Sequence, residues 1–315
     1  MKYSPDKIYQ EFRELLDLAD HIEETTWIFL DKFNQQQRKL FDFPSHQRIF
    51  LFILTRSIKT YSSIKHLCQQ GYGQDVCNLL RTLLENLITV KYILHHKEKA
   101  DNLAKRFVFY KWVIFRKQIG EQEKNFSLMS EQEKSDFLQR KEMIQSQVND
   151  FKKTFNIKSD QALVTWSGYS VRDMAKYVSP KLLDEYETTF RLCSRFSHPS
   201  ILGDQEYMVQ DDRSLIFSPL ASPIGIAPNL KSAIKYMLKF LTLVNNLYSL
   251  NCEQTLTDLQ IKFEHISNLE KFQKDVKTPE RTSNTPSSSI KESVIVFNTL
   301  LDTRPSLDNF QKKNS

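Results

Sequence analysis

The residues with the clearest potential for chemistry lie in one stretch, Arg191-Leu192-Cys193-Ser194-Arg195-Phe196-Ser197-His198. At about 100° per residue, one side of a helix here carries four polar side chains, those of Glu187, Arg191, Arg195 and His198. Two guanidinium groups can hold a phosphodiester, and a histidine with a pKa near neutrality can move the proton of a ribose 2′-OH. The stretch therefore predicts metal-independent RNA cleavage, with His198, Arg191 and Arg195 as catalytic residues.

The same residues also have a purely structural interpretation. Glu187 and Arg191 are four residues apart and can form an ion pair on a solvated helix surface, while His198 can simply end the helix beside the negative end of its dipole. Exposed ion pairs of this kind are common and stabilise a fold little. The residue types alone leave both interpretations open.

A second charged pair, Arg81 and Glu85, lies beside the leucine stripe of another predicted helix. The arginine precedes the glutamate, which is the less favourable order for an ion pair within one helix. We therefore expect the two side chains to point at something other than each other, with Glu85 orienting Arg195 or His198 across the bundle. An exposed salt bridge is the alternative.

Other chemistry finds little support. The sequence has no phosphate-binding glycine motif, no serine-hydrolase motif and no metalloprotease motif. The pair His95-His96 has no second cluster at metal-ligand spacing, so neither a metal nor a cofactor is predicted. Four cysteines without C-x-x-C spacing are predicted to be reduced thiols of a cytoplasmic protein, namely Cys68, Cys77, Cys193 and Cys252.

Charge and aromatic residues indicate where an anionic partner could bind. The net charge is +6, and seven Lys and Arg residues lie between Lys97 and Lys117 against Glu98 and Asp101. This basic strip is either phosphate-facing or a solvated helix face. The segment Trp166-Ser167-Gly168-Tyr169-Ser170 could stack on bases, or its tryptophan could anchor a loop onto the core.

The elements that must position these residues are predicted to be helices. No proline occurs between Pro44 and Pro180, and apolar residues recur at helical spacing. The pattern predicts five successive helices, at about 5–33, 45–70, 73–96, 98–120 and 130–157. Gly71-Tyr72-Gly73 should form the tight turn that makes the second and third helices antiparallel.

Capping residues predict the next elements. Ser170 with Asp173, and Ser179 with Pro180, are typical of helix starts, and the second of these helices should end at His198 because Pro199 follows. A small hairpin is expected from Tyr207–Gln210 and Ser214–Phe217, and a closing helix from Asn229 to Leu250. The predicted class is all-α, a multi-helix bundle with a small β-hairpin insertion.

The predicted domains are a bundle over residues 1–252 and a largely disordered, low-complexity tail over 253–315. Residues 278–289 read T-P-E-R-T-S-N-T-P-S-S-S, which is typical of a disordered linker. A short helix at 290–301 could dock on a protein partner. The longest apolar run, Ile49 to Leu54, is too short to span a bilayer, so no membrane association is expected.

Two resemblances add to this interpretation. The combination of Ser63-Ile64, Gly71-Tyr72, Arg81 with Glu85, Trp166-x-Gly168 and Ser194-x-x-x-His198-Pro199-Ser200 resembles an uncharacterised family of bacterial helical proteins over roughly residues 45–250. Arg191 and His198, separated by six residues, are similar to the R-x(4–6)-H signature of the HEPN superfamily. Members of that superfamily are helical bundles that often act as metal-independent ribonucleases in toxin–antitoxin and phage-defence systems.

The HEPN resemblance implies that Arg191 and His198 are a catalytic pair, completed by a second copy in a homodimer. Leu192 departs from the signature, where a polar residue is common. The leading hypothesis is thus a HEPN-like ribonuclease or RNA-binding effector, with Arg81 and Glu85 as supporting residues. The alternative is a non-catalytic helical interaction or regulatory module that binds a protein or nucleic acid through its basic strip and tail.

Overall fold

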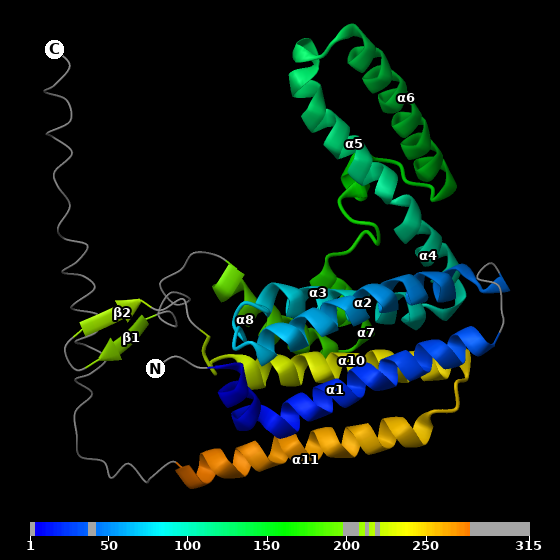
Figure 1. Ribbon diagram of the computed structural model, residues 1–315. Coiled ribbons are helices and arrows are strands. Elements are labelled where there is room, and N and C mark those ends of the chain that lie inside the picture. The colour runs from blue at the N-terminus through cyan, green and yellow to red at the C-terminus, as the bar shows by residue number, and fades with distance from the viewer. Residues whose placement is uncertain (1–3, 37–41, 198–207, 212–213, 218–220, 278–315) are drawn as a thin grey trace, which may run out of the picture. The chain divides into compact units, whose positions relative to one another are not determined.

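The computed structural model of the 315-residue chain describes residues 4–36, 42–197, 208–211, 214–217 and 221–277 (Figure 1). The predicted all-α class is confirmed, since long helices make up most of this part of the chain. Among the described residues, no helix is long and apolar enough to cross a membrane.

Four long helices form the centre of the bundle, α1 (Pro5–Gln35), α2 (Ser45–Gln69), α3 (Cys77–His95) and α10 (Ile226–Tyr248). Figure 1 shows α2 and α3 side by side, joined by the short turn that makes them antiparallel. Their apolar stripes share one core, in which Leu83, Leu87 and Phe240 are completely buried. Burial of large apolar side chains along helical stripes is what holds such a bundle together.

The turn between α2 and α3 is also a packing point for α10. Gly71 has φ +85°, a conformation that glycine adopts at no steric cost. A Cβ atom at Gly73 would lie 2.4 Å from the backbone nitrogen of Ile226, so the two backbones touch. Asn229 of α10 donates a hydrogen bond to the Gly73 carbonyl oxygen at 2.8 Å.

Two further helices, α7 (Val171–Val178) and α8 (Pro180–Ser197), pack against α3 and against each other. Both predicted capping residues are confirmed. The Ser170 side chain accepts from the backbone N–H of Asp173, and the Ser179 side chain accepts from that of Leu182. These caps satisfy backbone donors that the first turn leaves without partners.

The helix predicted at 98–120 divides in two at Tyr110. The resulting helices are α4 (Ala100–Phe109) and α5 (Lys111–Gln122), and they are followed by α6 (Glu131–Thr154). Three short 3-10 helices lie between or beside them: η2 (Lys97–Lys99) before α4, η3 (Glu123–Leu128) between α5 and α6, and η4 (Asp160–Leu163) after α6. A capping box at Ser130 and Glu133 starts α6. The hairpin of α5 and α6 encloses a separate small core built around Val113, Val148 and Phe151.

The predicted β-hairpin is confirmed within one residue. Strand β1 (Met208–Asp211) pairs antiparallel with β2 (Ser214–Phe217), and Val209 lies opposite Ile216. The prediction of a largely disordered tail from residue 253 is wrong for residues 253–277, which form helix α11 (Glu253–Lys277). Leu256 and Leu259 of this helix are buried, and the compact unit extends to Asn268. The predicted linker at 278–289 and helix at 290–301 lie outside the described residues.

Candidate functional site

Helices α3 and α8 run antiparallel, and a ladder of contacts fixes their register. Cys77 hydrogen-bonds Cys193, the Arg81 guanidinium carbon lies 4.1 Å from the centre of the Phe190 ring, and Glu85 lies near Tyr186. As the residue number rises on α3, it falls on α8. Helix α3 therefore faces α8 from Cys77 to Glu85.

Arg81 and Glu85 form the centre of this face. The Nε atom of Arg81 donates to Oε1 of Glu85 at 2.9 Å, and the two side chains are 37% and 33% exposed. The prediction that they point at something other than each other is wrong for this contact, although Arg81 also lies over Phe190 of α8. A cation–π contact at such a half-buried position contributes about 1 kcal/mol. The two contacts together restrict the guanidinium to one orientation.

Arg191 lies on another side of α8. Its side chain is 77% exposed, and it forms a long ion pair of 3.9 Å with Glu187. Glu187 is held more closely by Arg172 of α7, at 2.6 Å. Within the described residues, no contact joins Arg191 to Arg81 or Glu85, so the structure does not bring these predicted site residues together. The surface ion pair that the sequence offered as the alternative is present.

The rest of the predicted site is only partly described. Helix α8 includes the backbone of Arg195 and ends at Ser197, and His198 lies outside the described residues. Glu85 is level with Tyr186, and Arg195 is nine residues further on, about 13 Å along the helix at 1.5 Å per residue. Cys77, rather than Glu85, is thus the residue of α3 that lies level with the end of α8.

The two thiols at that end are buried among apolar residues. Cys77 is 2% exposed and Cys193 is completely buried, and both are reduced thiols, as predicted. The hydrogen bond with Cys77 lowers the pKa of Cys193, opposed by burial and assisted by the nearby Arg81 charge. The positive charge of Arg81 therefore acts on the Cys193 thiol, on the side of α8 that faces the core.

The structure also reveals a charged cluster that sequence reasoning missed. Glu185 of α8 is only 8% exposed, and its carboxylate accepts from Lys235 at 2.7 Å and from Lys239 at 2.5 Å. Burial raises the pKa of Glu185, but the hydrogen bonds from the two lysines outweigh it and the pKa is lowered overall. The two lysines lie on α10, 50 or more residues away in sequence, so no local spacing could have indicated them.

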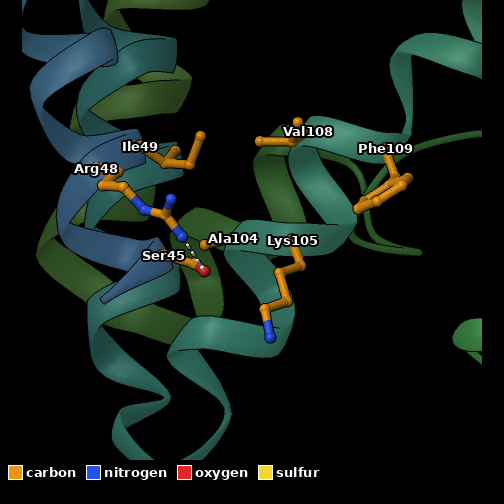
Figure 2. A pocket seen from close by; sticks show the side chains of 7 residues that line it. All are labelled: Ser45, Arg48, Ile49, Ala104, Lys105, Val108 and Phe109. Carbon is orange, nitrogen blue, oxygen red and sulfur yellow. Dashed lines mark hydrogen bonds between the residues drawn. The ribbon is translucent and has the colours of Figure 1, made fainter. Parts of the chain in front are cut away.

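The basic strip does not form one continuous face. Arg116 pairs with Asp160 at 3.5 Å, Lys111 lies 5.0 Å from the Trp112 ring, and Arg106 is half-buried. Lys105 lines a cavity of about 350 Å³ between the start of α2 and the second half of α4, with Arg48 opposite (Figure 2). Arg48 donates to Ser45 Oγ at 3.2 Å, and most of the other lining side chains are apolar. This cavity lies at the end of α2 remote from the Gly71 turn, and hence far from Arg81.

The protein is thus a helical bundle in which the half-buried pair Arg81 and Glu85 of α3 faces α8, the helix that ends at Ser197. In the part of the chain that the structure describes, no group of His, Cys, Asp and Glu side chains could hold a metal ion. The chain belongs to the family of unknown function designated DUF5677, which it matches over residues 47–215. That range includes both α3 and α8. No curated protein and no solved structure matches the chain.

Proposed function

We propose that the chain is a HEPN-like, metal-independent ribonuclease whose substrate binds beside the α3–α8 interface. The observation that carries the proposal is the fixed guanidinium of Arg81, held by Glu85 and the Phe190 ring on the helix that leads to His198. A fixed cation on the helix that faces α8 suits phosphodiester chemistry, because negative charge develops on the phosphate during reaction. Arg191, weakly held at 3.9 Å and largely exposed, is free to exchange Glu187 for a substrate phosphate.

The proposed reaction is a transesterification within the RNA. His198 takes the proton of the 2′-OH, the 2′ oxygen attacks phosphorus, and the bond to the 5′ oxygen breaks. The leaving oxygen gains a proton, which gives a 2′,3′-cyclic phosphate and a 5′-OH end. Arg191 and Arg195 would stabilise the pentacoordinate phosphate, with Arg81 and Glu85 in support and with a second copy of the chain completing the site.

The first prediction tests His198. Purified protein is incubated with labelled single-stranded RNA in EDTA, and the cleaved ends are analysed for cyclic phosphate. We expect His198→Ala to lower the cleavage rate by at least about 100-fold, because general acid–base catalysis contributes 10²–10⁴-fold. His66→Ala, which removes an exposed histidine of α2, is the matched control and should cleave normally. Equal activity of the His198→Ala protein, in vitro or as growth arrest in cells, would refute the assignment.

One observation favours the alternative of a non-catalytic interaction module. Arg172, Glu187 and Arg191 form an ion-pair network on the surface of α7 and α8, as in many solvated helix faces. That alternative predicts no turnover of any RNA, together with nucleic-acid or protein binding that weakens as salt increases. The EDTA cleavage assay separates the two functions, since only the ribonuclease produces new ends.

A further inference from the structure

A cluster of aromatic rings surrounds Tyr92, near the end of α3 remote from Cys77. Tyr92 is 3% exposed, and its ring centre lies 4.8 Å from that of His96 and 6.0 Å from that of Trp166. Tyr169 and Tyr177 lie beside it, with their ring centres 5.0 Å apart. Trp166 also packs edge-on against Phe107 at 5.2 Å, so it anchors the 163–170 segment as the structural alternative predicted.

In and next to this cluster, three buried polar atoms have no hydrogen-bond partner among the described residues. They are Nε2 of His96, which directly follows α3, Nε of Arg106 in α4, and Oγ1 of Thr165 in the segment before α7. The Arg106 charge acts on the Tyr92 hydroxyl, and an added Cβ at Gly168 would lie 3.7 Å from Arg106 Nη2. Buried polar atoms are nearly always paired, because an unpaired one costs about 1–3 kcal/mol.

Arg106 has the chemistry of an anion-binding group. No ion pair joins its guanidinium to a carboxylate within the described residues, and burial lowers its pKa. The charged groups that act on the neighbouring His96 are His95 and Lys99, which are also basic. An arginine that lies among aromatic rings and has no carboxylate partner in the described part of the chain is suited to a phosphate, which accepts several of its hydrogen bonds at once.

The outer rings of the cluster supply a stacking surface. Tyr169 is 40% exposed and Tyr177 is 50% exposed, so both rings can be reached from solvent while Tyr92 lies beneath them. Exposed aromatic faces next to a cation are the two components with which proteins hold single-stranded nucleic acid. A ligand that satisfies both has a flat base and a phosphate group.

The cluster lies on the same side of α3 as the Arg81–Glu85 pair. At about 100° per residue, Arg81, Glu85, Tyr92 and His96 fall within roughly 60° of one another around the helix. His96 follows Arg81 by fifteen residues, about 22 Å along the axis. We propose that Arg106, Tyr169 and Tyr177 bind one nucleotide of a single-stranded RNA whose scissile bond lies further along α3. This inference rests on the proposed function for its choice of RNA over other nucleotides.

The test measures binding separately from cleavage. All proteins carry His198→Ala so that the RNA stays intact, and affinity for a fluorescein-labelled uridine octamer is measured by anisotropy in EDTA. We expect Tyr177→Ala to weaken binding about tenfold, the loss of one base–aromatic stack. Arg106→Gln should weaken it by a similar factor and reduce the salt dependence. An RNA duplex of equal length should show little change with Tyr177→Ala, because its bases are not free to stack.

Matched controls and melting curves exclude a loss of folding. Tyr9→Ala removes a 41% exposed tyrosine from α1, and Arg140→Gln removes an arginine from α6. Neither should change the affinity. Unchanged octamer affinity in both Tyr177→Ala and Arg106→Gln, or no octamer binding by the parent protein, would overturn the inference. If the His198→Ala chain binds the octamer through these residues yet the wild-type chain cleaves no RNA, the nucleotide site stands and the ribonuclease proposal fails.

Discussion

Two glutamates of α8, only two residues apart, show how position decides what a charge contributes. Glu187 lies on the surface and shares its carboxylate between Arg172 and Arg191, where solvent screens the interaction. Glu185 is buried and accepts hydrogen bonds from Lys235 and Lys239 of α10. Removing one partner of a buried pair leaves an uncompensated charge, so Glu185 should matter far more to folding.

We predict that Glu185→Gln lowers the free energy of unfolding at pH 7 by about 2–3 kcal/mol, less than for a fully buried pair because both lysines are partly exposed. Since the folded-state pKa of Glu185 is lowered, its contribution is present above the unfolded-state pKa and is lost as the pH falls through the folded-state value. Urea unfolding of both proteins from pH 7 to pH 3 measures this difference.

The control for this prediction is Glu131→Gln, which removes an exposed carboxylate paired with Lys134 at 2.7 Å. It should change stability by less than about 0.5 kcal/mol. Equal stability of the two variants at pH 7, or a Glu185→Gln effect that grows as the pH falls, would contradict the assigned role of the carboxylate.

The same contrast explains which site contacts the sequence could predict. The pair Glu187 and Arg191 was visible because its members are four residues apart on one helix. The contacts of Glu185 with α10, and the meeting of Arg106 with Tyr92, depend on how separate helices pack. The aromatic segment at residues 166–170 and the four-residue spacing of Tyr92 and His96 were the local signals of the aromatic cluster.

At the scale of elements, the turn between α2 and α3 fixes where α10 begins. The backbone of Gly73 lies directly against Gly225 and Ile226, so there is no room for a side chain. Asn229 ties the same turn to α10 through the Gly73 carbonyl. The register of three central helices therefore depends on one glycine.

We predict that Gly73→Ala lowers the free energy of unfolding by about 3 kcal/mol, at the upper end of overpacking costs, because its Cβ would meet backbone atoms 2.4–2.7 Å away. Gly120→Ala is the matched control, since Gly120 lies within α5 and its Cβ would meet nothing within 4 Å. It should stabilise the helix by about 0.5–1 kcal/mol. Opposite shifts in the melting temperatures of the two variants would support this account, whereas a neutral Gly73→Ala would refute it.

Helix boundaries were predictable where side chains cap the backbone and unpredictable where only packing ends a helix. Ser170, Ser179 and Pro180 marked the starts of α7 and α8 within a residue. The break at Tyr110 has no proline or glycine. There the Tyr110 hydroxyl donates to the carbonyl oxygen of Val164 at 2.6 Å, a contact between distant segments. Tertiary contacts therefore fix the boundary between α4 and α5.

At the scale of the whole molecule, α11 is a helix of the bundle that the polar composition of its segment did not indicate. Its mean character is polar, yet Leu256, Leu259, Phe263 and Ile266 recur at spacings of three, four and three residues. The first two are buried in the main core, and the other two pack against it. A narrow apolar stripe in a polar segment is enough to pack a helix against a core. The prediction that the bundle ends at residue 252 did not take this stripe into account.

We therefore predict opposite outcomes for two truncations. A chain ending at Asn268 should keep the melting temperature within about 2 °C, because the compact unit ends there. A chain ending at Cys252 should lose about 3–5 kcal/mol, since two buried leucines contribute about 1.5–3 kcal/mol each and their neighbours would become exposed to water. Thermal unfolding followed by circular dichroism compares both with the full chain. Similar stability of the two truncated chains would show that α11 does not stabilise the bundle, whatever its burial.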